Sequence, residues 1–151
     1  MSALARTSLE QARLVRTRLV DPWRTSLWAV QLLLAAVFGD DGFTKATESI
    51  DALAKTFKWP GDVSEGLVRA IGGSELVAAL SLLLPAATRI LPQLTPLAAA
   101  FLALLMWVSF VYDVMRSEWQ ILMINVALGL LATFVVWGRF AKAPIRSRFD
   151  N

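Results

Sequence analysis

Four long runs of apolar side chains constrain the fold of this chain more than any other feature of its sequence. The hydrocarbon core of a membrane is about 30 Å thick, so a helix that crosses it needs roughly 20 apolar residues. Four segments approach this length, and they run from about Trp23 to Lys45, Leu67 to Ile90, Thr95 to Tyr112 and Trp119 to Trp137. The sequence therefore predicts an all-α fold, an integral membrane four-helix bundle with up-down-up-down topology.

A soluble helical bundle is the alternative, and the composition argues against it. Hydrophobic residues make up 56% of the chain and charged residues only 18%, which leaves little polar surface for a soluble domain of 151 residues. A helix in a soluble bundle carries an apolar stripe, whereas the third and fourth segments are apolar on every side. We therefore favour the membrane interpretation.

Residues that favour helix ends stand between the four segments. The sequence predicts N-caps at Asp21 before Pro22, at Asp62, at Thr95 before Pro96 and at Ser117. Between the first two segments, apolar residues recur at helical spacing over residues 50–57, ahead of a Pro-Gly pair. This pattern predicts a short helix that lies on the outer surface and covers the bundle.

Lysine and arginine are distributed unevenly over the predicted connections. Ten of the fifteen lie on one side of the membrane: Arg6, Arg13, Arg16, Arg18, Arg24, Arg89, Arg139, Lys142, Arg146 and Arg148. The other five lie on the opposite side: Lys45, Lys55, Lys58, Arg69 and Arg116. Connections rich in Lys and Arg remain in the cytoplasm, so both termini are predicted to be cytoplasmic.

The chain divides into three predicted parts. Residues 1–22 form an N-terminal tail whose helical wheel is amphipathic, with Leu4, Leu9 and Leu19 on one face and Arg6 and Arg13 opposite. Such a helix would lie on the inner membrane surface or dock on a partner protein, and a frayed, solvated tail is the alternative. Residues 23–139 form the transmembrane domain, and residues 140–151 form a basic C-terminal tail.

Polar residues inside the apolar segments are costly in lipid, so each calls for a reason. All of them except Gln31 fall in the outer half of the bilayer, and they come from all four segments, which predicts one polar cluster beneath the outer surface. The cluster consists of Asp40, Asp41, Lys45, Gly72, Glu75, Asp113 and Asn125. Three roles remain open for it: a hydrogen-bonded network that holds the helices together, a ligand or proton site, or a surface on which a partner docks.

The residue types that are absent limit the chemistry. The chain has no histidine and no cysteine, which removes the usual neutral-pH base, the thiolate nucleophile and the common zinc and haem ligands. No phosphate-binding glycine loop or nucleophile motif is present, so we predict no catalytic residues and no metal site, and we lean against an enzyme. The net charge of +3 is not gathered on a basic face, so no nucleic-acid partner is expected.

Three stretches together resemble the DoxX-like family of small bacterial membrane proteins. The first is FGDDGFTK (residues 38–45), which is similar to the F-x-x-x-G-x-x-K end of the family's first span. The second runs from Ile71 to Met106 and resembles the G-x-x-E helix, the proline turn and the L-T-P-L-A-A start of the third span. The third is Asn125 with the closing Gly138-Arg139 pair.

The resemblance implies a four-helix bundle in the bacterial inner membrane, with Lys45, Gly72, Glu75 and Asn125 at the family's recurrent polar positions. Some relatives are tied to sulfur-compound or quinone-linked redox metabolism, or to complexes formed under oxidative stress. The chain departs from the family pattern at Asp40 and Asp41, where small residues are common, and at Asp113, where histidine is common. These departures favour a binding, interaction or structural role over inherited catalysis.

Two functions follow from the sequence. In the first, the polar cluster binds a lipophilic ligand, a quinone or a lipid, or associates with a membrane redox system, with Trp107, Phe110 and Tyr112 packing on the ligand. In the second, the chain is a non-catalytic accessory subunit that joins a larger membrane complex through contacts of Trp107, Phe134 and Trp137. Membrane lipid, further copies of the chain or other membrane subunits are the expected partners, and no cofactor other than a bound quinone or lipid is predicted.

Overall fold

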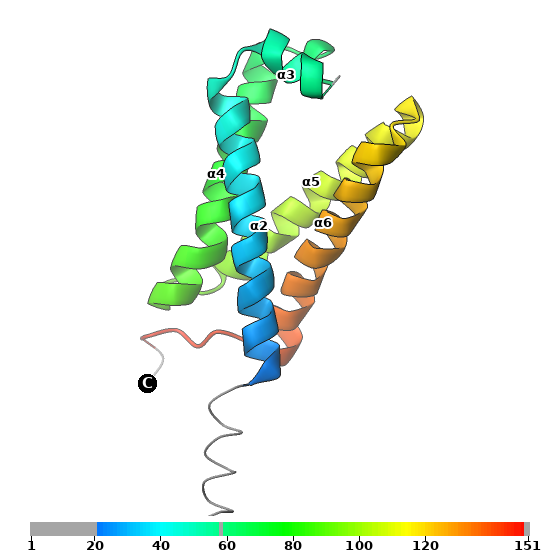
Figure 1. The fold of residues 1–151 in the computed structure, drawn as a ribbon. Helices are drawn as coiled ribbons and strands as arrows, with labels where there is room; N and C mark the ends of the chain where they lie inside the picture. Colours follow the sequence, from blue (N-terminus) through cyan, green and yellow to red (C-terminus); the bar gives the residue numbers. More distant parts are fainter. Residues whose placement is uncertain (1–20, 58, 150–151) are drawn as a thin grey trace, which may run out of the picture.

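Four long helices run alternately up and down in the part of the chain that the structure, a computed structural model, describes: residues 21–57 and 59–149 (Figure 1). They are α2 (Pro22–Thr47), α4 (Glu65–Thr88), α5 (Leu94–Arg116) and α6 (Trp119–Trp137). The predicted all-α, up-down-up-down bundle is confirmed. The amphipathic helix predicted within residues 1–22 falls outside the described residues, apart from Asp21 and Pro22 at the start of α2.

Short elements lie at both ends of the bundle. The predicted surface helix is α3 (Ile50–Thr56), and a 3-10 turn, η1 (Trp59–Gly61), follows it at the end that we call the loop end. At the opposite, termini end, α6 continues into a π-helical turn, η2 (Gly138–Lys142), and residues 143–149 then run beneath the end of α4 (Figure 1).

All four long helices are long and apolar enough to cross a membrane, with the fourth stretch reaching Lys142. Only 28–39% of each apolar stretch is buried within the chain. Large apolar side chains such as Val77, Leu80 and Leu104 therefore point outward. Outward apolar surface on every helix is the arrangement expected where lipid is the solvent.

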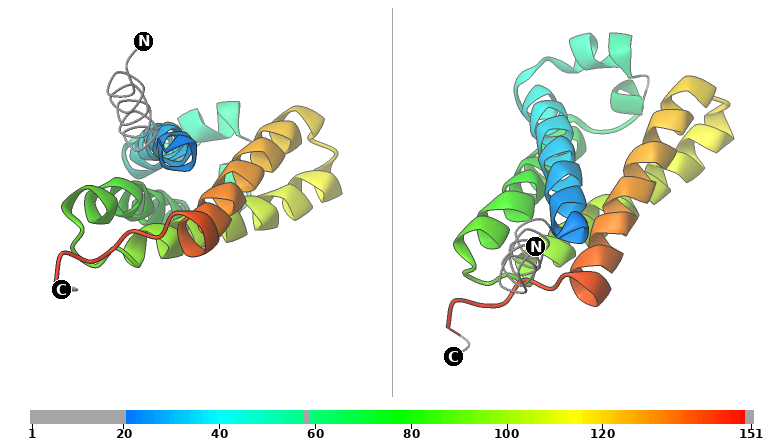
Figure 2. Two further views of the ribbon diagram at one scale, coloured as in Figure 1. Left: turned by 90° about the horizontal axis from the view of Figure 1, so that it is seen from below. Right: turned by 60° about the horizontal axis from the view of Figure 1, so that its bottom comes forward.

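The helices associate as two pairs, α2 with α4 and α5 with α6. The pairs lie close together at the termini end and diverge toward the loop end (Figures 1 and 2). The core accordingly sits in the half of the bundle nearer the termini end. Its largest members are Leu34 and Phe38 of α2, Leu82 of α4, Leu102 and Met106 of α5, and Val135 of α6.

Two glycines allow α2 and α4 to touch through their backbones. A Cβ atom added at Gly72 would lie 2.7 Å from the Cβ of Lys45 and 2.8 Å from the carbonyl oxygen of Gly42. A Cβ atom added at Gly42 would lie 2.7 Å from the carbonyl oxygen of Gly72. Glycine at both positions is therefore what brings the two helices close enough to place Lys45 beside α4.

One of the four predicted N-caps is confirmed, at Asp21, whose carboxylate accepts a 3.1 Å hydrogen bond from the backbone N–H of Trp23. The other three are wrong, because helices α4, α5 and α6 are preceded by Ser64, Gln93 and Glu118. Asp62 instead accepts hydrogen bonds from Arg116 and Tyr112 of α5. The local sequence predicts that the Asp62 carboxylate caps a helix, but in the structure this carboxylate forms a long-range ion pair with Arg116.

Replacement of Gly72 by alanine tests the helix contact. We expect Gly72→Ala to lower the free energy of unfolding by about 1–3 kcal/mol, because the new methyl group must push α2 away from α4. Gly73→Ala is the matched control, since a Cβ atom there has no neighbour within 4 Å. Unfolding by SDS in mild detergent measures both variants, and equal stabilities would contradict the backbone contact.

Candidate functional site

Lys45, near the end of α2, is the centre of a buried ion-pair cluster. Its Nζ donates hydrogen bonds to Oε1 and Oε2 of Glu75 at 2.8 and 2.9 Å, and to Oδ2 of Asp41 at 2.7 Å. The Glu75 side chain has no exposed surface, and Lys45 is also buried. The ring of Trp59 lies 5.6 Å from Nζ, a cation–π distance. One ammonium group therefore holds two carboxylates from two helices beneath an indole ring.

Local geometry explains why these groups meet. Asp41 and Lys45 are four residues apart on α2, so they lie on the same face of the helix. The Gly42–Gly72 contact then sets Glu75, one turn further along α4, opposite that face. Arg69 braces the end of α2, because its Nη1 donates a 2.7 Å hydrogen bond to the carbonyl oxygen of Lys45.

The second hydrogen-bonded group joins α5 to α6. Nδ2 of Asn125 donates a 2.6 Å hydrogen bond to Oδ2 of Asp113. Asp113 is buried, and it lies near the end of α5, where its carbonyl oxygen accepts a 3.0 Å hydrogen bond from the backbone N–H of Glu118. An acid and an amide are thus fixed on the helix pair opposite the Lys45 cluster.

A cavity of about 300 Å³ lies between the two groups, where the helix pairs diverge. Asp41, Lys45 and Glu75 line it from α2 and α4, and Asp113 and Asn125 line it from α5 and α6. Most of the remaining wall is apolar or aromatic, and it includes Phe57, Trp59, Ile71, Leu105, Tyr112 and Ile121. A few polar groups thus converge within a wall that is mostly apolar.

The structure brings most of the predicted site residues together, but as two groups and not as one cluster. Among the described residues, no hydrogen bond joins the Lys45 group to the Asp113–Asn125 pair. Gly72 contributes through the helix contact beneath the cavity. Asp40 is exposed and does not line the cavity. The two adjacent aspartates therefore have different surroundings.

Several residues of the cavity escape prediction from sequence. Of the three aromatic residues expected to face a ligand from α5, only Tyr112 lines the cavity, and Trp107 and Phe110 pack on each other. Trp59, the first residue of η1, covers the Lys45 ammonium. The position of Trp59 depends on how η1 folds back over the bundle. A turn of three residues is too short to show a periodic pattern from which that position could be predicted.

The charges of the cavity wall define what it can hold. Three carboxyl groups, those of Asp41, Glu75 and Asp113, face a single ammonium group, that of Lys45. Among the described residues, no three acid, histidine or cysteine side chains are grouped as metal ligands. All three N–H groups of Lys45 are used on Asp41 and Glu75, whereas Asn125 uses one of its two on Asp113 and keeps the other as a donor, and the carboxylates keep acceptor lone pairs. Such a wall suits a neutral molecule that carries hydrogen-bonding oxygen atoms.

Removal of the central ammonium group tests the ion-pair cluster. We expect Lys45→Met to lower the free energy of unfolding by about 3–5 kcal/mol, because the Glu75 carboxylate stays buried without its partner. The double variant Lys45→Met/Glu75→Leu should recover most of that loss, since no uncompensated charge remains. Lys55→Met, at an exposed position of α3, is the control. SDS unfolding of all three checks this, and a stable single variant would refute it.

Comparison with known proteins gives one result. No curated protein and no solved structure matches the chain. The sequence profile of the DoxX-like family matches residues 29–135, which covers α2 from its second turn to the last turn of α6 and includes the cavity between them. With four membrane-spanning helices and a match over most of its length, the chain is a multi-pass membrane protein that belongs to the DoxX-like family.

Proposed function

We propose that the loop-end cavity binds the polar head of a neutral lipophilic ligand, and that a quinone of a membrane redox system is its first candidate. The observation that carries this proposal is the composition of the wall. Fixed polar groups, Lys45 with its carboxylates and Asn125 with Asp113, face each other across a space that is otherwise apolar and aromatic. A quinone ring presents an apolar face and carbonyl oxygens at its edge, and the wall offers both kinds of contact.

Charge favours a neutral ligand over an anionic lipid. With three carboxyl groups and one ammonium group in the wall, a phosphate headgroup would meet more negative than positive charge. A carbonyl oxygen carries no net charge and can accept a hydrogen bond from the second N–H of Asn125 Nδ2, which the bond to Asp113 leaves available. The electrostatics of the cavity therefore support a quinone or a neutral lipid head.

Size favours a head group and not a whole molecule. A volume of about 300 Å³ stands at the lower end of small-molecule sites, roughly 300–1,000 Å³. An isoprenoid or acyl tail would have to remain between the helices and the surrounding lipid. The cavity forms where the α2–α4 and α5–α6 pairs diverge, so in this proposal a ligand that diffuses in the membrane enters between the two pairs.

The accessory-subunit function stays a prediction. The structure weakens one argument for it, which is that aromatic side chains are available to contact another subunit. Trp107 contacts Phe110, and Phe134 and Trp137 contact Trp23 at the start of α2. These rings therefore have aromatic partners within the chain and do not themselves call for a second protein. Association with further copies or with other membrane subunits remains a separate proposal, which co-purification in mild detergent would test.

A substitution that fills the cavity tests the ligand proposal. We expect an azido-quinone to label the parent chain on cavity peptides after illumination in lipid nanodiscs. Ser109→Phe should reduce the labelling at least about tenfold, equivalent to about 1.4 kcal/mol of binding free energy, because the phenyl ring occupies the ligand's space. Peptide mass spectrometry quantifies the label.

Leu104→Phe is the matched control, since Leu104 lies on the same helix, is exposed and does not line the cavity. The control should keep the parent's labelling, and both variants should unfold at the parent's SDS concentration. Equal labelling of the two variants, or a parent chain labelled no more than an unrelated membrane protein, would refute the proposal.

We also propose that the chain lies in the bacterial inner membrane with its termini end in the cytoplasm. The basic residues support this orientation. Arg24, Arg89, Arg139, Lys142, Arg146 and Arg148 belong to the termini end, and Lys45, Lys55, Arg69 and Arg116 to the loop end. The excess at the termini end is the bias found on cytoplasmic faces.

Single cysteines test the orientation, because the chain has no cysteine of its own. In spheroplasts, we expect a membrane-impermeant maleimide to label Ser64→Cys, which is exposed ahead of α4 at the loop end. Ser147→Cys, in the segment after η2, should react only after the membrane is permeabilised. Gel-shift with a maleimide polymer reads out both, and the reverse pattern would overturn the orientation.

A further inference from the structure

We infer that the termini end holds a binding site for the phosphate of an anionic phospholipid. The site is a cavity of about 290 Å³ between α2, the end of α4, η2 and the segment that follows η2. Four arginines line it, Arg24, Arg89, Arg139 and Arg146, together with Trp28. No acidic residue lines it within the described part of the chain. This inference is independent of the loop-end cavity and of what binds there.

Arg139 is the buried member of the site. Its side chain is almost fully buried, and among the described residues no carboxylate lies within ion-pair distance of it. Gln31 of α2 accepts hydrogen bonds from its Nε and Nη2 atoms, and the ring of Trp28 lies 5.7 Å from its guanidinium carbon. A buried cation that contacts an amide, a ring and one distant carbonyl oxygen, but no carboxylate of the described chain, would be stabilised by an anion.

The guanidinium group also has donors to spare. Of its five N–H groups, Nε and Nη2 each use one on Gln31, and Nη1 uses one in a long 3.5 Å hydrogen bond to the carbonyl oxygen of Ala143. Two remain without an acceptor in the described chain. Gln31 is itself held by a 2.6 Å hydrogen bond from its Nε2 to the carbonyl oxygen of Leu82, so the orientation of Arg139 is fixed in advance.

Backbone contacts place Arg89 and Arg146 at the cavity. Arg89 caps the end of α4 in a left-handed conformation, with φ of 59°, a position that glycine adopts at lower cost. Its carbonyl oxygen accepts a 3.0 Å hydrogen bond from the backbone N–H of Arg148, which ties the segment after η2 to the end of α4. That tie brings Arg146 to the cavity wall beside Arg89.

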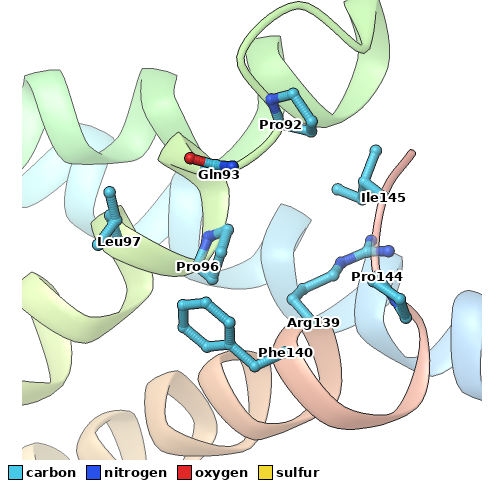
Figure 3. Close-up of a pocket in the computed structure, with 8 residues that line it drawn as sticks. All are labelled: Pro92, Gln93, Pro96, Leu97, Arg139, Phe140, Pro144 and Ile145. Carbon is cyan, nitrogen blue, oxygen red and sulfur yellow. The ribbon is translucent and has the colours of Figure 1, made fainter. Parts of the chain in front are cut away.

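An adjoining apolar cavity argues for a lipid over a free phosphate. A space of about 360 Å³ shares Arg139, Pro144 and Ile145 with the basic cavity, and its other walls include Pro96, Leu97 and Phe140. Figure 3 shows Phe140 facing Pro96, and the Arg139 guanidinium group reaching toward the segment of Pro144 and Ile145. A basic site next to an apolar one at a membrane-spanning helix end matches a phosphate headgroup joined to acyl chains.

The test measures the dissociation constant of a fluorescent short-chain phosphatidylglycerol for the full chain in neutral detergent. Arg89→Gln/Arg146→Gln removes two exposed cavity arginines, and we expect it to weaken binding about 25-fold, about fivefold for each arginine. The matched control, Lys142→Gln/Arg148→Gln, removes the same charge from side chains that do not line the cavity. We expect the control to stay within about twofold at 0.15 M salt, because exposed charges are screened there.

Four outcomes would overturn the inference. Equal weakening by the two double variants, with unfolding unchanged in both, would mean general attraction to basic surface and no site. A phosphatidylcholine of the same chain length that binds as tightly would mean that the negative charge is not recognised. Inorganic phosphate or glycerol phosphate that displaces the lipid at the lipid's own concentration would make the ligand a soluble phosphate. Parent chain that binds no phosphatidylglycerol would remove the site altogether.

Discussion

The backbone contact between α2 and α4 at Gly42 and Gly72 is the constraint on which the loop end of this protein depends. Because the two helices touch there without side chains between them, Lys45 reaches Glu75 at 2.8 Å from the neighbouring helix. The contact fixes the register of the pair, and the register decides which polar groups meet. With bulkier residues at either glycine, the ammonium and the carboxylate would be buried apart, each at considerable cost.

Divergence of the two helix pairs then gives the molecule two polar sites of opposite character. At the loop end the pairs separate, and acidic groups outnumber the lysine in the cavity between them. At the termini end the pairs close, and the polar space that remains lies at the margin, where the charged residues that line it in the described part of the chain are all arginines. The neutral ligand proposed for one end and the anionic headgroup proposed for the other both rest on how each end collects its charges.

Sequence alone predicts the helices and most of the loop-end site, because a charge within an apolar run stands out wherever it occurs. Lys45, Glu75, Asp113 and Asn125 were found in this way, and the structure gathers them around one cavity. The sequence alone does not separate Asp40 from Asp41. Their side chains point in directions that differ by about 100° around the helix, so they face different surroundings. Nor does it show that Arg139 is buried, because a charge near a span end resembles any flanking charge until Gln31 of a distant helix meets it.

Stability alone does not account for the buried Lys45–Glu75 pair. A buried ion pair is often no more stabilising than apolar side chains of similar volume, and in lipid such side chains would carry no desolvation penalty. The close approach of α2 and α4 is already fixed by the two glycines, so the pair is not needed to hold the helices together. What the pair supplies, and apolar residues would not, is an ammonium group and a carboxylate held at fixed positions on the wall of a cavity. This desolvation penalty is the argument for the proposed binding role over a role in helix packing alone.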